Sequence, residues 1–249
     1  MAIDTDAGNL GHLDPLIQKV EFKLTVLSEE EDTVQGLLRR ERGQPQRREV
    51  YFYDTKDLAL FGEDLVLRAR VTQGDDDDST VKLRPVDLAD GQASWRQIDG
   101  IRIELDVVGG TQVRSAKLDG EPDRGEIEEV AAKQRPVASL FSGKQEQLIA
   151  DHAPDGISLH ELEVLGPVDA RKWDLDNPEG FPYTLSVEEW SLPDATRFIE
   201  LSFKVSADEA NDAQMAFRAF LTGLELDVAG DQMAKTPRVL KYFADRLNA

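Results

Sequence analysis

Alternation of charged and apolar residues along short segments is the sequence feature that most constrains the fold of this chain. It is clearest in the runs KVEFKL at residues 19–24 and RIELDV at residues 102–107. A period of two puts the charged side chains on one face of a β-strand and the apolar ones on the other. Such strands are accommodated when the apolar core lies outside the sheet and the sheet encloses a wet, charged interior. The pattern therefore predicts a β-barrel whose inner wall is polar.

Segments with strand character recur along the chain and are separated by helical patterns. The strand signals predict about eight or nine short strands, at Gln18–Leu27, Arg48–Asp54, Leu65–Val71, Thr80–Arg84, Gly100–Val108, Gln145–Ala150, Gly156–Leu165, Thr184–Glu189 and Phe198–Val205. We also expect four helices: one capped by Ser28 and Glu31 and ending near Arg42, one over Gly125–Gln134, one over Asp208–Leu224 with Met215, Phe217, Phe220 and Leu221 in its apolar stripe, and one with Thr236 as N-cap and Pro237 following, to Leu247.

Domain organisation follows from what the chain lacks. The sequence contains no internal repeat, no heptad run and no proline-rich linker. We therefore expect a flexible N-terminal segment over residues 1–16 and a single domain over residues 17–249, α+β in class and mainly β, with helices packed on the outside of the barrel. Cysteine is absent, which excludes disulfides and thiolate chemistry. No membrane span or signal peptide is visible, so we expect a soluble, cytoplasmic protein that does not bind membranes.

Four cations stand at i, i+2 spacing on two apparently adjacent strands. They are Arg68 with Arg70, and Lys82 with Arg84, and a turn rich in Asp separates the two pairs. Alternate residues of a strand share a face, so the four would form one basic surface suited to an anion. The alternative is that they are solvated strand residues that balance the acidic turn at residues 75–78.

The rest of the chain has the opposite charge. It has 29 Lys and Arg against 49 Asp and Glu, a formal net charge of −20. A polyanion would be repelled by most of such an exterior, so we exclude nucleic acid as a partner. A small anion can still reach a sheltered basic pocket, because exposed charges are screened over about 8 Å at physiological salt.

Carboxylates recur at strand spacing beside cations. Glu21 lies between two lysines, Glu104 is followed by Asp106, Glu161 by Glu163, and Glu200 precedes Lys204 by four residues. Taken singly, each acidic pair is as easily explained as exposed strand charge. Their repetition favours a phosphate chain bound with Mg²⁺, which takes hard oxygen ligands from carboxylates and phosphate while Arg or Lys neutralise the remaining charge.

Several motifs together resemble a known family. They are VEFKL at 20–24, YFYDTKDLALFGEDLVLRAR at 51–70, VKLR at 81–84 and KTPRVLKYF at 235–243. The chain is similar in these segments to CYTH-domain proteins, members of the triphosphate tunnel metalloenzyme superfamily. The resemblance implies an eight-stranded antiparallel closed barrel that forms a tunnel, a divalent metal (Mg²⁺ or Mn²⁺), and a small-molecule triphosphate or polyphosphate as ligand. The oligomeric state stays open, a homodimer included.

The resemblance also implies roles for individual residues. The basic residues implied to bind phosphate are Lys23, Arg68, Arg70, Lys82, Arg84, Lys144, Lys204 and Lys235. The implied metal ligands are Glu21, Glu104, Asp106, Glu161, Glu163 and Glu200, with Glu161 and Glu163 also polarising the attacking water. Two positions depart from the family pattern: Lys19 occupies the place of the first glutamate of its E-x-E-x-K motif, and Ser202 follows Glu200 where another acid is expected.

Three functions are compatible with this pattern. The first is metal-dependent binding and hydrolysis of inorganic triphosphate or a nucleoside triphosphate, in which positioning and charge neutralisation supply most of the rate. The second, suggested by Lys19, is a tunnel that binds polyphosphate or a nucleotide without turnover. The third is a class IV type adenylate cyclase, although no segment of the sequence indicates an adenine pocket.

Overall fold

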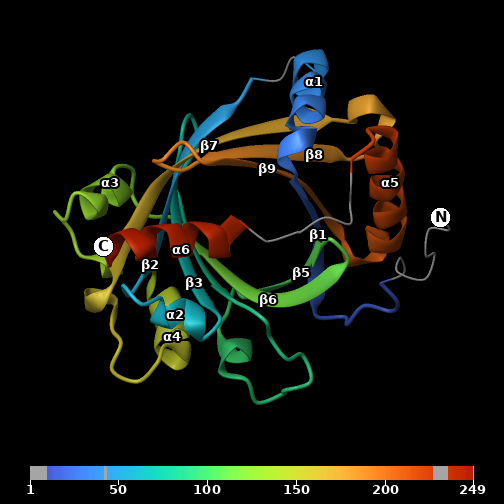
Figure 1. Ribbon diagram of the computed structural model, residues 1–249. Coiled ribbons are helices and arrows are strands. Elements are labelled where there is room, and N and C mark those ends of the chain that lie inside the picture. Colours follow the sequence, from blue (N-terminus) through green and yellow to red (C-terminus); the bar gives the residue numbers. More distant parts are fainter. Residues whose placement is uncertain (1–9, 42–43, 227–234, 249) are drawn as a thin grey trace.

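Nine strands close into one barrel in the computed structural model, which describes residues 10–41, 44–226 and 235–248 (Figure 1). The strands are β1 (Ile17–Val26), β2 (Gln46–Asp54), β3 (Leu65–Thr72), β4 (Asp78–Leu83), β5 (Arg102–Val108), β6 (Thr111–Gly120), β7 (Glu163–Asp176), β8 (Thr184–Ser191) and β9 (Arg197–Ser206). Around the barrel their order is β1-β5-β6-β4-β3-β2-β7-β8-β9, and β9 pairs with β1 to close it.

The expected fold class is confirmed, with two corrections. The barrel has nine strands rather than eight, and it is mixed rather than wholly antiparallel, because β1 and β5 pair in parallel. These two corrections have one cause. Strand directions cannot alternate all the way around a closed ring with an odd number of members, so at least one neighbouring pair must run the same way.

Helices cover the outside of the barrel, as the alternation predicts. They are α1 (Glu31–Glu41), α2 (Ala59–Gly62), α3 (Glu126–Ala131), α4 (Gly143–His152), α5 (Ala210–Gly223) and α6 (Lys235–Leu247). Val34 and Leu37 of α1 and Phe217 of α5 are buried in one large apolar cluster with the outward-facing residues of the strands, such as Phe22 and Phe203. The main core therefore lies between the barrel and its helices.

A second, smaller apolar cluster lies within one end of the barrel. Helix α6 crosses this end (Figure 1) and contributes Val239 and Leu240, which pack with inward-facing strand residues such as Phe52, Val66 and Trp190. Both α6 residues are at most 2% exposed. The helix thus covers part of one mouth of the barrel and is anchored there by its own apolar side chains.

Several local predictions were wrong. Residues 145–150 form the middle of α4 rather than a strand, and most of residues 156–165 form a loop and a short 3₁₀ turn before β7. Strand β6 and most of β7 were not predicted at all. Met215 is 61% exposed and does not belong to the buried stripe of α5.

Three chain segments begin differently from expectation. The backbone N–H of Leu27 donates a hydrogen bond to the Glu30 carboxylate. Glu30, rather than the predicted Glu31, therefore caps the first helix. Helix α6 starts at Lys235, which puts Thr236 inside its first turn. Part of the segment predicted to be flexible, residues 1–9, lies outside the described residues, whereas Leu10 is buried and donates its N–H to the Asn211 side chain.

Candidate functional site

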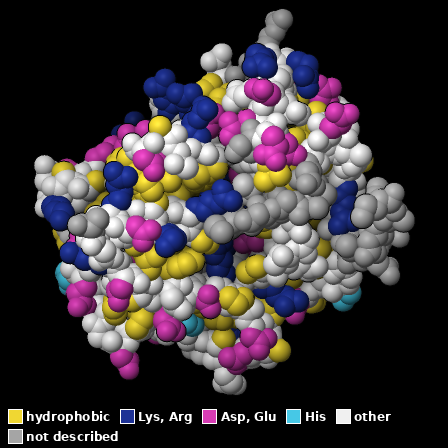
Figure 2. Space-filling view, viewed as in Figure 1, with side chains coloured by type: hydrophobic (Ala, Val, Ile, Leu, Met, Phe, Trp, Pro, Cys, Tyr) yellow, Lys and Arg dark blue, Asp and Glu magenta, His cyan; other side chains and the backbone are white. Residues whose placement is uncertain are grey.

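A cavity of about 1180 Å³ runs through the barrel. Ten Lys and Arg side chains and seven Asp and Glu side chains line it, which reverses the sign of the charge balance of the whole chain. Lys and Arg side chains are visible in the central hollow of the face shown in Figure 2. The interior therefore attracts anions although the molecule as a whole repels them.

The YDT segment shapes the wall that carries the basic residues. Asp54 at the end of β2 is 2% exposed and accepts backbone hydrogen bonds from Thr55, Leu60 and Phe61, at 2.7, 2.9 and 2.9 Å. The Thr55 hydroxyl accepts another from Ala59. These bonds fix the turn and the short helix α2 between β2 and β3, and so set where the side chains of β3 point.

The four cations singled out in the sequence all line the cavity. Arg68 and Arg70 lie on β3, Lys82 on β4 and Arg84 directly after it. Thr80 is the cross-strand partner of Arg68, and Val66 is that of Lys82. The predicted basic surface exists, and it faces inward.

Three carboxylates converge on the wall beside these cations. Ligand oxygens of Glu21, Glu104 and Asp106 lie within 4.8 Å of one another, and we call this group the acidic triad. Glu21 lies on β1, and the other two lie on β5, where they are 4% and 3% exposed. The parallel pairing of β1 with β5 sets Glu21 directly beside Asp106.

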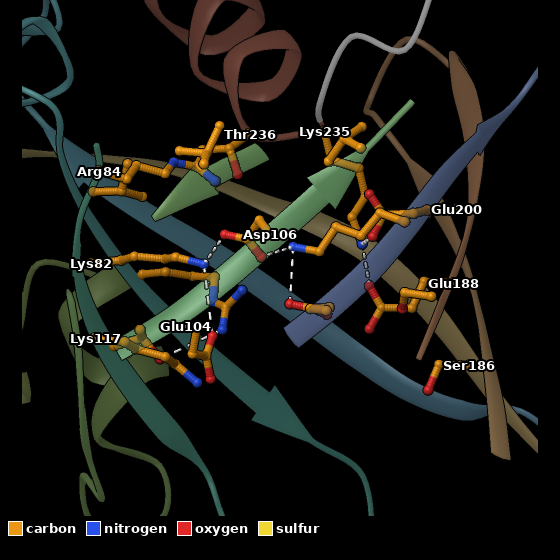
Figure 3. Close-up of a pocket in the computed structure, with 18 of the residues that line it drawn as sticks. Lys82, Arg84, Glu104, Asp106, Lys117, Ser186, Glu188, Glu200, Lys235 and Thr236 are labelled. Carbon is orange, nitrogen blue, oxygen red and sulfur yellow. Dashed lines mark hydrogen bonds and ion pairs between the residues drawn. The ribbon is translucent and has the colours of Figure 1, made fainter. Parts of the chain in front are cut away.

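Lysines hold the acidic triad in place. Lys23 lies 3.0 Å from Glu21 and 2.9 Å from Asp106. Figure 3 shows Lys82 beside Asp106, at 2.6 Å. Lys204 bridges Glu21 and Glu104 at 3.4 and 3.2 Å.

The pKa values in this network follow its ion pairs. Burial by itself favours the neutral forms, but the attraction of Glu21 and Asp106 raises the pKa of Lys23 above its usual range. In the same way burial of Asp106 is outweighed by Lys23 and Lys82, which lower the pKa of that carboxyl. The acidic triad is therefore ionised at neutral pH and can present oxygen ligands to a cation.

A second ionic cluster lies near α6. Lys235 contacts Glu188 of β8 and lies 2.8 Å from Glu200 of β9 (Figure 3), and its ammonium group is also stacked over the Trp190 ring. Arg48 reaches Glu188 from the other side at 3.3 Å. Burial of Glu188 is outweighed by Lys235 and Arg48, so the pKa of this carboxyl is lowered.

Lys117 on β6 is a further cation of the inner wall, next to Lys82 across the strand pair. Its ammonium group lies 3.1 Å from Asp119, which also accepts a hydrogen bond from Thr80 at 2.9 Å. Burial, only partly offset by Glu104, lowers the pKa of Lys117 to about 7.

Some of the residues predicted for the site lie elsewhere. Glu161 is exposed in the 3₁₀ turn and accepts hydrogen bonds from Ser158, while Glu163 pairs with Lys133 at 3.9 Å. Lys144 pairs with Asp99 on the surface. Glu161 and Glu163 were predicted to share a strand face, but the HELEV segment is a turn up to Glu161, so the two-residue period of a strand does not apply there. Of the other predicted residues, Lys23, Lys204, Lys235, Glu21, Glu104, Asp106 and Glu200 line the cavity with the four cations.

Lys19, the departure from the family motif, is exposed and does not line the cavity. Ser202 does line it, between the two ionic clusters of the interior. The substituted cation therefore lies outside the ring of charges around the acidic triad.

Six charged residues of the lining were not predicted from the sequence, namely Arg48, Asp64, Lys117, Lys172, Asp174 and Glu188. Glu188 and Arg48 lie on predicted strands. Glu188 shares a strand face with Ser186, so the two-residue period alone could have predicted which way the Glu188 side chain points. Lys117, Lys172 and Asp174 lie on β6 and the second half of β7, which carried no recognised strand signal.

Solved structures resemble this chain over nearly its whole length. A putative adenylate cyclase from Bacillus halodurans superposes with a TM-score of 0.61 at 15% identity, over 89% of this chain and 96% of its own. A putative adenylyl cyclase from Hippeastrum, described as having a dominant triphosphatase activity, gives 0.63 at 17% identity, over 91% and 96%. This chain has the triphosphate tunnel fold. The resemblance inferred from the motifs is thus confirmed at the level of the fold.

The matches found among known proteins are all to solved structures. No family model and no curated protein matches the sequence. Among the described residues, none of the helices has the length and apolar character needed to cross a membrane.

Proposed function

We propose that this protein binds a triphosphate-containing substrate inside the barrel and hydrolyses it with the help of Mg²⁺ or Mn²⁺. One observation carries the proposal: ten cations and seven acids line a closed barrel in a chain of net charge −20. A basic interior inside an acidic molecule suits a small, highly charged anion and excludes long polyanions that would have to lie on the surface.

The substrate phosphates would lie against the wall formed by β3 and β4. Arg68 has a buried Nε without a hydrogen-bond partner, and among the described residues its side chain makes one hydrogen bond, a 3.5 Å contact with Thr80. A phosphate oxygen would supply the missing acceptor, and a guanidinium can bind phosphate with two parallel bonds. Lys82 lies on the next strand and Arg84 directly after it, and both would neutralise neighbouring phosphate oxygens.

The donor set of the acidic triad fits a divalent cation. Three carboxylates with oxygens within 4.8 Å of one another offer the hard ligands that Mg²⁺ and Mn²⁺ prefer. Once bound, such an ion would neutralise charge on the phosphate oxygens and polarise the attacking water. Lys23, Lys82 and Lys204, which neutralise the triad in its absence, would then be available to the phosphates.

A second candidate, binding without turnover, is favoured by the pairing of the lining acids. Six of the seven lie within ion-pairing distance of Lys or Arg, and the exception among the described residues is Asp64. Glu161 and Glu163, expected to activate water, lie outside the cavity. Adenylate cyclase activity has less support: the face of Trp190 is covered by Lys235, and Phe52 is 1% exposed, so neither ring is free to stack on a base.

Phosphate release from tripolyphosphate and ATP, with Mg²⁺ or Mn²⁺, tests the proposal. The double variant Arg68→Ala, Arg70→Ala is compared with Arg39→Ala, Lys56→Ala, which removes the same charge from exposed positions. We expect metal-dependent release by the wild type and the control and its loss in the cavity variant. Calorimetric binding of tripolyphosphate without any release in the wild type would favour the binding module, and cyclic AMP formed from ATP would favour the cyclase.

A further inference from the structure

A second group of cations lines the barrel beyond the acidic triad. Arg70 of β3, Arg48 of β2 and Lys172 of β7 lie on three consecutive strands, and we call them the rim cations. The register makes Arg48 a diagonal neighbour of both others, because it pairs with Thr72 on β3 and with Ala170 on β7. Diagonal neighbours are about 7–8 Å apart, within reach of long side chains.

The rim cations lie toward the end of the barrel that α6 does not cross, although Arg48 also shares Glu188 with Lys235 of that helix. Along β2 the inward residues run from Arg48 to Phe52, and Phe52 belongs to the apolar cluster under α6. Along β3 the order is reversed: Val66 belongs to that cluster, and Arg70 is four residues farther from it. The rim cations therefore stand near the mouth that α6 does not cover.

Among the described residues each rim cation pairs with one acid, and two of these acids are partly exposed. Arg70 pairs with Asp78 at 2.9 Å and Lys172 with Asp174 at 2.7 Å, and the two acids are 25% and 48% exposed. Ion pairs with such exposed members contribute little, on the order of 0–1 kcal/mol, so an incoming anion can replace them.

The cations themselves repel one another. Burial, together with the positive charge of Arg70, lowers the pKa of Arg48, although Glu188 pulls in the opposite direction. The arginine is held by Glu188 at 3.3 Å and by the Gln46 side chain at 2.8 Å. An additional anion between the two arginines would relieve the repulsion.

The rim cations continue the wall on which the substrate is proposed to bind. Arg68 and Arg70 are two residues apart on one face of β3, which places them about 7 Å apart along the barrel. A phosphate chain that starts at Arg68 and extends away from α6 would therefore meet Arg70 first and then Arg48 and Lys172.

We infer that Arg48, Arg70 and Lys172 form a second phosphate subsite, which binds the phosphates of a linear oligophosphate beyond its first three. This inference rests on the proposed function and narrows it to a substrate class. Inorganic chains longer than triphosphate would gain affinity from the rim cations, whereas triphosphate would depend mainly on Arg68, Lys82 and Arg84.

The double variant Arg48→Gln, Lys172→Gln tests the inference against a matched control. Arg47 and Arg171 are the sequence neighbours of the two residues, and both are exposed on the outer face of the same strands. The control is therefore Arg47→Gln, Arg171→Gln. Binding of tripolyphosphate and of a short-chain linear inorganic polyphosphate is measured by calorimetry for wild type, variant and control, all with unchanged circular dichroism.

We expect the ratio of polyphosphate affinity to tripolyphosphate affinity to fall at least about tenfold in the variant and to be unchanged in the control, because two charge-assisted contacts are lost. An unchanged ratio in the variant, with tripolyphosphate still bound, would overturn the inference and leave the proposed function intact. Failure of the wild type to bind either anion would instead overturn the proposed function. Should the double variant not fold, Lys172→Gln alone gives the same comparison at a half-exposed ion pair.

Discussion

Arg68 is a buried cation of the inner wall that makes no ion pair with any carboxylate of the described chain. Its Nε is buried and without a partner, and burial, reinforced by Arg70, lowers its pKa to about 10. An unpaired buried charge costs free energy of folding. The position is therefore better explained by a ligand than by stability.

Replacing Arg68 by methionine should separate its effect on stability from its effect on ligand affinity. In Arg68→Met we expect the melting temperature to stay the same or rise, because an apolar side chain of similar length replaces a desolvated charge. Tripolyphosphate affinity should fall roughly tenfold to a hundredfold, as for a lost hydrogen bond to a charged group. Thermal denaturation and calorimetry measure the two effects. A variant that loses stability but keeps affinity would assign Arg68 to the scaffold.

The lowered pKa of Lys117 predicts that ligand binding is coupled to the uptake of a proton. Its pKa of about 7 leaves the amine mostly neutral at pH 8, and an adjacent phosphate anion would raise this pKa again. Binding of tripolyphosphate at pH 8 should therefore take up close to one proton, and at pH 6, where the amine is already charged, almost none. Calorimetry in buffers of different ionisation enthalpy measures the uptake. The same uptake in Lys117→Gln would exclude this residue as its source.

The elements of the barrel wall were predicted unevenly, for physical reasons. Strands with charged and apolar residues in alternation, such as β1 and β5, were recognised because one face is wet and the other packed. The Gln145–Ala150 segment was taken for a strand since QEQLIA also alternates over a short stretch, yet Ser142 caps a helix there. Charges from facing strands were grouped correctly only where the strands themselves were recognised.

Helix α4 approaches the barrel closely at Gln145. Gln145, 0% exposed, donates to Ser79 and to the Leu118 carbonyl, and it lies directly over Gly120 of β6. A Cβ at Gly120 would come within 2.3 Å of the Gln145 amide oxygen and 2.7 Å of the Ser79 hydroxyl. The glycine at the end of β6 is what lets the helix lie so close.

Alanine substitution at this contact should loosen the helix from the sheet. We expect Gly120→Ala to lower the free energy of unfolding by about 1–3 kcal/mol through overpacking. Gly223→Ala, at the end of α5 with no heavy atom within 4 Å of the added Cβ, should be neutral or slightly stabilising. Urea denaturation compares the two. Equal stability of both variants would mean that Gln145 moves aside without cost.

At the scale of the whole molecule, metal and anion should bind cooperatively. Lys23, Lys82 and Lys204 neutralise the acidic triad, so a metal ion alone must displace them. A triphosphate gives these lysines another anionic partner. The increase in melting temperature with Mg²⁺ and tripolyphosphate together should therefore exceed the sum of the two separate increases. Additive shifts, or the same excess in Asp106→Asn, would contradict a metal at the triad.

Placing the core outside the barrel separates the residues that maintain the fold from those that meet a ligand. Substitutions on the outward faces of the strands disturb the packing of α1, α4 and α5, whereas the charged inward positions line the cavity. The inner wall can therefore change its pattern of charges while the architecture persists. Proteins with this arrangement can diverge in sequence and acquire new anionic substrates while the fold is kept. The 15–17% identity to the structures that share the fold agrees with this.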